Sequence, residues 1–167
     1  LVSADDTETV LSFKINSYDL KTVKTQNGDE VIVISEDLTP MLQKGFPDLP
    51  KYTESIIIPD MGSTTFEIVS AKYETISDVY IAPSKGNLTR DVDPSTIPYE
   101  YGEIYTKDAF YPSQEASLST PYIARDFRGQ AVHVYPFSYN PVQKELRVYN
   151  EITVKIKTGK ASGENEF

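Results

Sequence analysis

The sequence predicts an all-β fold, either a sandwich or a barrel, made of many short strands. Apolar and polar residues alternate along several short segments, glycine and proline signals separate those segments, and no segment carries a helical period. Strand-favouring residues are frequent, including 12 tyrosines, and tryptophan is absent. With 167 residues, 39% of them hydrophobic, the chain is long enough for one domain with its own core.

The first part of the chain contains a predicted strand and a predicted hairpin. Residues 1–8 are polar, and we expect them to form a disordered N-terminal arm. Residues 11–15 alternate between apolar and polar side chains, which is typical of a strand. Residues 18–25 and 30–35 flank Asn27-Gly28, which is the strongest short hairpin signal because both residues accept a positive φ.

The middle of the chain mixes predicted strands with irregular segments. Residues 40–50 contain three prolines and a glycine, which indicate an irregular connector. Residues 55–58 form a predicted short buried strand, residues 64–75 a longer one, and residues 79–81 another. Residues 83–114 are rich in proline and lack periodicity, and an irregular stretch of this length is often functional.

Three more strands are predicted near the C-terminus, in residues 117–126, 130–136 and 145–157. In the last of these, apolar residues of one parity are expected to face the core: Leu146, Val148, Ile152, Val154 and Ile156. Residues of the other parity are expected to face water: Arg147, Tyr149, Glu151, Thr153, Lys155 and Lys157. Asn150 interrupts the apolar row and predicts a bulge or bend. We therefore place the domain in residues 9–158 and a polar linker in residues 159–167.

Composition and charge argue against several classes of function. The net charge of −9 disfavours binding to phosphate backbones, so we expect no nucleic-acid partner. No apolar run approaches the roughly 20 residues that span a bilayer, so we expect no membrane span. The chain has no cysteine and one histidine, so we expect no disulfide, no cysteine catalysis, no metal site and no cofactor.

Motifs for catalysis are also absent, and we expect no catalytic residue. The chain has no phosphate-binding glycine loop and no G-x-S-x-G nucleophile turn. His133 is the only imidazole, and its alternating surroundings favour an ordinary strand residue over a catalytic base. Asp91 and Asp93 are a possible calcium pair, but they lack the EF-hand spacing and are interpreted as solvated turn residues. We conclude that the chain is not an enzyme.

Short motifs follow one another along almost the whole chain. They are GFPDLP at 45–50, IIIP at 56–59, VYIAPSKG at 79–86, IPYEYG at 97–102, FYP at 110–112, RDFRGQ at 125–130, YNP at 139–141 and LRVY at 146–149. Each motif is weak alone, but their order and spacing are specific. From about residue 9 to 158, the chain resembles the propeptide of the gingipains, cysteine proteases that cleave Arg-X or Lys-X bonds, and it is most similar to the arginine-specific branch.

This resemblance implies a fold, a function and a partner. The fold would be a two-sheet antiparallel β-sandwich of jelly-roll-like form. The domain would act as an N-terminal prodomain, an intramolecular chaperone and an inhibitor that keeps the zymogen latent. Its partner would be the catalytic domain of its own arginine-specific cysteine protease, bound in cis before processing, and residues 159–167 would lead toward that domain. The location would be bacterial and exported: periplasmic, extracellular or at the cell surface.

The resemblance also assigns an inhibitory loop. Arg90 matches the arginine that would enter the specificity pocket of the protease, and its loop neighbours are Lys85, Asn87, Leu88, Thr89 and Asp91. An arginine-specific pocket would carry a carboxylate, which a guanidinium group binds in a bidentate geometry. The alternative is that Arg90 is an ordinary exposed turn residue. Arg125 and Arg128 are rivals for the role, and we expect them instead to pair with acidic neighbours.

A second function remains open from the sequence. The chain could be a stand-alone extracellular β-sandwich module for adhesion or carbohydrate binding, with some of its 12 tyrosines as stacking platforms. Core packing and strand pairing account for tyrosines equally well. The two functions are distinguished by the gene: continuation past Phe167 into a domain with a catalytic His and Cys would indicate a prodomain, whereas a stop or a series of repeat modules would favour the binding module.

Overall fold

The computed structural model describes residues 1, 3–4 and 7–167. Within these ranges the chain forms strands and two short 3-10 helices: β1 (Ser3–Ala4), β2 (Glu8–Lys14), β3 (Asp19–Thr25), β4 (Gly28–Ile34), β5 (Thr39–Pro40), β6 (Pro50–Ile58), β7 (Thr64–Ile76), η1 (Pro94–Thr96), η2 (Glu103–Thr106), β8 (Ala116–Leu118), β9 (Tyr122–Ala124), β10 (Phe127–Val134), β11 (Phe137–Asn140) and β12 (Glu145–Thr158). No helix in the described part of the chain is long and apolar enough to cross a membrane.

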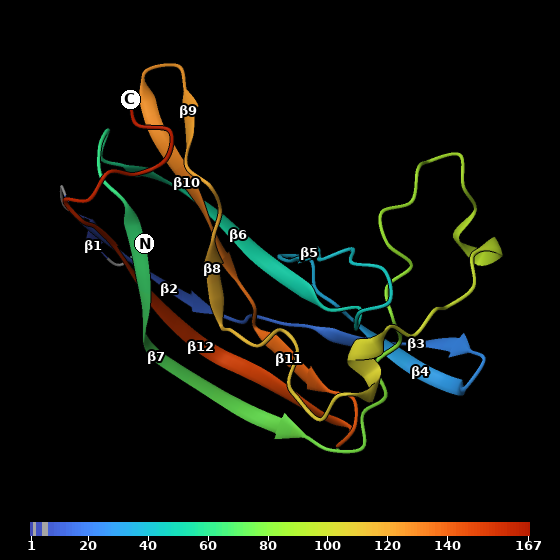
Figure 1. Cartoon of the computed structure of the whole chain (residues 1–167). Coiled ribbons are helices and arrows are strands. Elements are labelled where there is room, and N and C mark those ends of the chain that lie inside the picture. The colour runs from blue at the N-terminus through green and yellow to red at the C-terminus, as the bar shows by residue number, and fades with distance from the viewer. Residues whose placement is uncertain (2, 5–6) are drawn as a thin grey trace.

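Two antiparallel sheets pack against each other (Figure 1). In the first sheet, the long strand β12 pairs with β7 on one side and with β2 and β11 on the other, and β1 extends it beyond β2. In the second sheet, β10 pairs with β6, β8 and β9, and β5 adds to β6. The predicted all-β, two-sheet antiparallel architecture is confirmed.

A hydrophobic core joins the two sheets. It is built from buried residues of both: Leu11, Ile56, Ile58, Ala116, Val132, Val134, Tyr149, Ile152, Val154 and Ile156. The five residues of the last strand that were predicted to face inward are at most 3% exposed: Leu146, Val148, Ile152, Val154 and Ile156. The parity of this strand therefore predicted its buried face correctly.

The surroundings of Asn150 depart from that parity. Asn150 is exposed and lies at a register shift between Tyr149 and Glu151, so the predicted bulge is confirmed. The prediction that Tyr149 faces water was wrong, because it is only 5% exposed. Its ring centroid lies 5.3 Å from that of Tyr73, and its N–H donates to the Pro136 carbonyl at 2.8 Å. A bulge interrupts strict alternation, so a residue beside it can leave the face that parity assigns.

The hairpin of β3 and β4 forms a small sheet of its own. The predicted hairpin is confirmed, but the turn residues are Gln26 and Asn27, because Gly28 already pairs with Thr25. Of the two residues of the Asn-Gly pair, only Gly28 takes a positive φ, of 108°. A second core cluster lies where the hairpin, the connector and the start of β12 meet: Val33, Leu38, Leu49, Val79, Ile81, Phe137, Tyr139, Leu146 and Val148.

Two predicted strands are shorter or more broken than expected. Residues 79–81 form no named strand, and Ile81 makes a single parallel bridge to Val31. Residues 117–126 divide into β8 and β9 around Pro121. Proline has no N–H to donate to a ladder, which explains the break.

The two termini lie on the sandwich. The predicted disordered arm, residues 1–8, includes β1, which pairs with β2, while positions 2, 5 and 6 lie outside the described residues. Residues 159–167, here called the C-terminal strap, run along the turn between β6 and β7. Backbone bonds of 2.8 Å join Ser63 N–H to the Ala161 carbonyl and Phe167 N–H to the Asp60 carbonyl. That this segment leads toward a protease domain stays a prediction.

Candidate functional site

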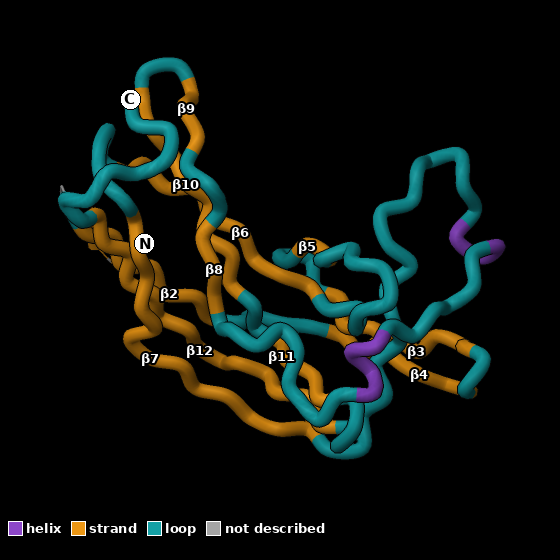
Figure 2. The backbone as a smooth tube through the Cα atoms, in the orientation of Figure 1, coloured by secondary structure: helices purple, strands orange, loops and turns teal. Residues whose placement is uncertain are grey.

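A long loop projects from one end of the molecule. Residues 85–99, here called the projecting loop, leave the body of strands at the end opposite the C-terminus (Figure 2), and η1 is their only regular element among the described residues. None of these side chains is buried. The loop lies within the irregular segment that the prolines of residues 83–114 predicted.

Both limbs of the projecting loop are fixed at their base to residues 44–46. On the incoming limb, Ser84 N–H donates to the Phe46 carbonyl at 2.8 Å, and Gly45 N–H donates to the Ser84 carbonyl at 3.1 Å. On the outgoing limb, Gly102 N–H donates to the Gly45 carbonyl at 2.9 Å. A Cβ atom at Gly102 would lie 2.9 Å from the Gly45 carbonyl oxygen, so the two backbones touch. The loop therefore leaves the body from a closed base.

The β3–β4 hairpin supports the outgoing limb. Gln26 Nε2 donates to the Tyr99 carbonyl at 2.8 Å. The Tyr101 hydroxyl bonds to the buried Glu30 carboxylate and lies 3.1 Å from Thr25 Oγ1. Burial, helped by the bond to Glu30, raises the pKa of Tyr101, which keeps this hydroxyl protonated as a donor. The hairpin thus holds the end of the loop through side chains of both its strands.

The tip of the loop is a closed turn with Arg90 and Asp91 at its centre. Val92 N–H donates to the Thr89 carbonyl at 3.1 Å, which closes the turn. A hydrogen bond from the Thr89 side chain lowers the pKa of Asp91 and thereby favours its carboxylate form. The exposed side chain of Asn87 and the partly buried side chain of Leu88 precede this turn.

Asp93 caps the short helix η1 just after the turn. Its carboxylate accepts hydrogen bonds from the Ser95 N–H at 3.0 Å and the Ser95 hydroxyl at 2.8 Å. These bonds lower the pKa of Asp93. The carboxylates of Asp91 and Asp93 therefore bond to neighbouring residues of the loop. The described residues contain no group of three or more His, Cys, Asp or Glu that could hold a metal ion.

Arg90 is exposed at this tip, and its guanidinium group makes no hydrogen bond or ion pair with any described residue. Arg147 differs, because its guanidinium carbon lies 3.7 Å from the Phe110 ring centroid and 4.8 Å from that of Tyr73. Arg90 is therefore free to bind a group outside the domain.

Neither Arg125 nor Arg128 forms the predicted ion pair with an acidic neighbour among the described residues. Backbone hydrogen bonds from Gly163 and Gly62, with a smaller contribution from the charge of Arg128, lower the pKa of Glu166. Arg125 is exposed in the turn between β9 and β10, with a positive φ of 56° and no ion pair among the described residues. Arg128 is completely buried, and its guanidinium donates to the carbonyls of Pro59 at 3.0 Å, Gly62 at 2.9 Å and Glu164 at 2.6 Å. These carbonyls belong to a turn and to the strap, which have no ladder partners for them, so backbone oxygens take the place of carboxylates.

His133 lies near the end of β10, as its interpretation as a strand residue predicts. Its Nδ1 atom is 3.0 Å from the Thr53 hydroxyl on the neighbouring strand. Burial, with the nearby charge of Lys51, lowers the pKa of His133 and favours the neutral ring. This cross-strand contact accounts for the imidazole.

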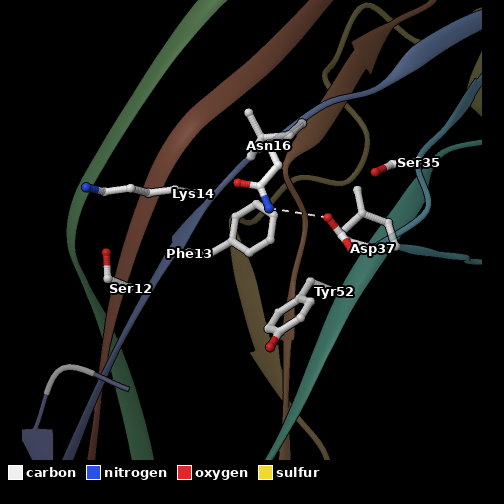
Figure 3. A pocket seen from close by; sticks show the side chains of 9 residues that line it. Ser12, Phe13, Lys14, Asn16, Ser35, Asp37 and Tyr52 are labelled. Atoms are coloured by element: carbon white, nitrogen blue, oxygen red, sulfur yellow. Dashed lines mark hydrogen bonds between the residues drawn. The ribbon is translucent and has the colours of Figure 1, made fainter.

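The cleft shown in Figure 3 lies between the end of β2, β6 and the segment after β4. It has a volume of about 350 Å³. Asn16 Nδ2 donates to Asp37 at 3.3 Å, and the ring centroids of Phe13 and Tyr52 are 5.2 Å apart. Lys14 extends away from the Asn16–Asp37 pair (Figure 3), and no histidine lines the cleft. The Ser35 hydroxyl donates to the Ser17 carbonyl at 2.8 Å and Asp37 accepts from Asn16, so these two side chains do not form a pair of nucleophile and base.

The exposed tyrosines do not form a free stacking platform. Tyr80 is 48% exposed, but the ammonium of Lys144 lies 5.2 Å from its ring centroid. Tyr122, at 36% exposed, covers Gly129, where an added Cβ would meet the ring at 2.7 Å. Tyr73, at 48%, packs against Tyr149 and Arg147. A carbohydrate-binding face built from these rings gains no support from their geometry.

Comparison with known proteins identifies the family. The model of the family described as Propeptide_C25 matches residues 1–166. The chain belongs to this family. As a Propeptide_C25 domain it is a propeptide and not a catalytic domain.

The relatives of this propeptide are gingipains of Porphyromonas gingivalis. Gingipain R2 of strain ATCC 33277 is 37% identical over 165 residues, which are 99% of this chain and 22% of that protein. Lys-gingipain HG66 is 23% identical over 152 residues, which are 87% of this chain and 9% of that protein. The resemblance to gingipain propeptides, and to the arginine-specific branch in particular, is confirmed. The chain spans about a fifth of the length of gingipain R2.

Solved structures confirm the fold. The complex of P. gingivalis RgpB pro- and mature domains contains a chain that superposes with a TM-score of 0.96 and 36% identity, over 99% of this chain and 87% of that one. A structure of gingipain K from P. gingivalis, described as an insight into its zymogenic latency, gives a TM-score of 0.77 at 21% identity, over 94% of this chain and 90% of that one. The second likeness shows the fold alone.

Sequence reasoning selected the projecting loop but missed what supports it. The GFPDLP motif served only to recognise the family, whereas Gly45 and Phe46 hold the base of the loop. The contact of Tyr101 with Glu30 joins residues 71 positions apart, and no local pattern reveals it. The sequence offered one signal for this contact: Glu30 occupies an inward position of the predicted strand 30–35, and a buried carboxylate needs a hydrogen-bond partner.

Proposed function

We propose that this propeptide acts as an intramolecular chaperone and as an inhibitor of the cysteine protease catalytic domain with which it is made. Its membership of the Propeptide_C25 family supports this function, as does its likeness to the prodomain of RgpB, which was solved in complex with its mature domain. We further propose that the protease is arginine-specific and that the zymogen is exported to the periplasm, the cell surface or beyond.

We propose that latency depends on insertion of Arg90 into the specificity pocket of the protease. The observation that carries this proposal is the unpartnered guanidinium group at the tip of a projecting loop. A charged side chain that makes no internal contacts loses none when it binds elsewhere. The base of the loop is fixed by Gly45 and by Gln26, so less entropy is lost on binding than for a free peptide. Lys85, Asn87, Leu88, Thr89 and Asp91 would complete the inhibitory loop.

The test is inhibition of the partner catalytic domain by the purified propeptide, measured by titration on a small Arg-X substrate. Arg90→Ala removes the guanidinium and leaves the carboxylate of the pocket unpaired, which typically costs about 2–5 kcal/mol of binding. The inhibition constant should rise roughly 30-fold to several-thousand-fold. Arg90→Lys should also weaken inhibition, because an ammonium group cannot form the bidentate contact.

The matched control is Arg125→Ala. Arg125 is also exposed in a turn, and it lies in the β9–β10 hairpin, away from the projecting loop (Figure 1). This variant should inhibit as well as the wild type. Equal inhibition by Arg90→Ala and the wild type would overturn the assignment of Arg90. Failure of the wild type to inhibit would overturn the inhibitory function itself.

A further inference from the structure

Lys85 connects the two limbs of the projecting loop. It lies at the start of the incoming limb, and its Nζ atom donates to the Pro94 carbonyl on the outgoing limb at 2.7 Å. The same ammonium group lies 4.3 Å from the ring centroid of Tyr99, at the end of that limb. One side chain therefore closes the loop on either side of Arg90, across nine residues of chain.

Four further hydrogen bonds stiffen the segment between Lys85 and Tyr99. The turn bond from Val92 N–H to the Thr89 carbonyl measures 3.1 Å. The Asp93 cap fixes the first turn of η1, and the Thr96 hydroxyl donates to the Asp93 carbonyl at 2.7 Å. The hydrogen bond between the side chains of Thr89 and Asp91 spans the residue between them. The peptide bond after Arg90 therefore lies in a closed turn, and hydrogen bonds hold the residues before and after it.

We propose that Lys85 is a positioning residue that makes Arg90 an inhibitor of an arginine-specific protease and not a substrate. The inference rests on the proposed function of the loop. Lys85 holds the residues on both sides of the Arg90–Asp91 bond, so that the protease binds Arg90 but cleaves after it slowly.

The chemistry of peptide cleavage explains why the contacts of Lys85 affect the rate of cleavage. The thiolate of a cysteine protease attacks the Arg90 carbonyl carbon, and the bond from that carbon to the Asp91 nitrogen breaks. The nitrogen takes a proton from the general acid of the protease and leaves as an amine, and water then releases the Arg90 acyl group from the thioester as a carboxylic acid. Net cleavage requires the amine to move away before it attacks the thioester again.

The braced loop keeps that amine in place. After the bond breaks, Asp91 would still be tethered through the Asp93 cap and through the contact between Lys85 and Pro94. A nucleophile that is held beside its acyl group reacts at a very high effective concentration, so resynthesis of the bond competes with hydrolysis. The closed turn also resists the extended conformation in which peptides pair with the edge of a protease.

The test measures cleavage of the Arg90–Asp91 bond by an arginine-specific endoprotease unrelated to the partner, followed by intact mass spectrometry. Lys85→Met removes the ammonium group and keeps the apolar stem. Cleavage after Arg90 should be about tenfold faster than in the wild type, as expected for the loss of a hydrogen bond from a charged donor. Lys85→Arg, which retains a cationic donor, should restore most of the resistance. The control is Lys107→Met, an exposed lysine beyond the loop, which should be cleaved at the wild-type rate.

A second measurement does not depend on any protease. Hydrogen exchange at the Val92 amide reports opening of the turn, and it should be faster in Lys85→Met and unchanged in Lys107→Met. Equal exchange and equal cleavage in the wild type and Lys85→Met would overturn the role of Lys85. Because neither readout uses the partner protease, they remain informative if Arg90→Ala proves to inhibit normally.

Discussion

At the scale of single residues, the charged carboxyl group of Asp48 destabilises the fold because it is partly removed from water. Asp48 lies beneath the base of the projecting loop, partly buried, and no described residue forms an ion pair or hydrogen bond with its side chain. Burial raises the pKa of Asp48 above its ordinary value of 3.8. Between that value and the raised pKa, the folded state binds more protons than the unfolded state, so stability falls as the pH rises through this window.

Asp48→Asn should therefore increase the free energy of unfolding at pH 7, because the amide removes the buried charge and keeps the shape. At pH 3 the advantage should disappear, since the carboxyl group is then neutral in both states. Urea unfolding at the two pH values measures the difference, with Asp19→Asn on the exposed face of β3 as the control. A stabilisation that is equal at both pH values would show that desolvation of the charge is not its cause.

At the scale of elements, strand β12 carries the core on one face. Ile152 is completely buried between the sheets, whereas the neighbouring Thr153 is partly exposed and its hydroxyl lies 3.3 Å from that of Ser12. Ile152→Ala should cost roughly 2–5 kcal/mol of stability, because it leaves a cavity in a packed core. Thr153→Ala should cost less than about 1 kcal/mol, the net value of one ordinary hydrogen bond. Chemical denaturation of the two variants checks the difference, and similar losses would contradict the assignment of faces.

The elements also show how far local pattern can predict this fold. Alternation predicted the buried face of β12, and Asn-Gly predicted the hairpin, because both signals act over a few residues. Alternation failed at Tyr149, whose burial follows from a bulge and from contact with Tyr73 on another strand. Local pattern also failed to predict the partners of Arg128, because they lie 36 to 69 positions away. The loop around Arg90 was recognised from its prolines and its family, but its support by distant residues depends on tertiary contacts.

At the scale of the whole molecule, Arg128 joins three separate parts of the chain. Its guanidinium binds the turn after β6 through Pro59 and Gly62 and the C-terminal strap through Glu164. Arg128→Met should leave these buried carbonyls unpaired, at about 1–3 kcal/mol for each, and should loosen the strap. The expected result is a loss on the order of 3 kcal/mol or more in the free energy of unfolding, measured by denaturation.

The position of Arg128 separates this effect from inhibition. The strap and the projecting loop lie at opposite ends of the molecule (Figure 1), so folded Arg128→Met should retain wild-type inhibition. Limited proteolysis should at the same time release the strap faster than in the wild type. A variant that keeps full stability would show that Arg128 does not hold these segments together.

The surroundings of Arg128 resemble the coordination sphere of a metal ion. Carbonyl oxygens from separate segments converge on one positive charge, as they do around many bound calcium ions. Here the cation is a covalent part of β10, so it cannot dissociate, exchange with the medium or be extracted by a chelator. The contacts of Arg128 with the strap and with the turn after β6 therefore do not depend on the concentration of free calcium.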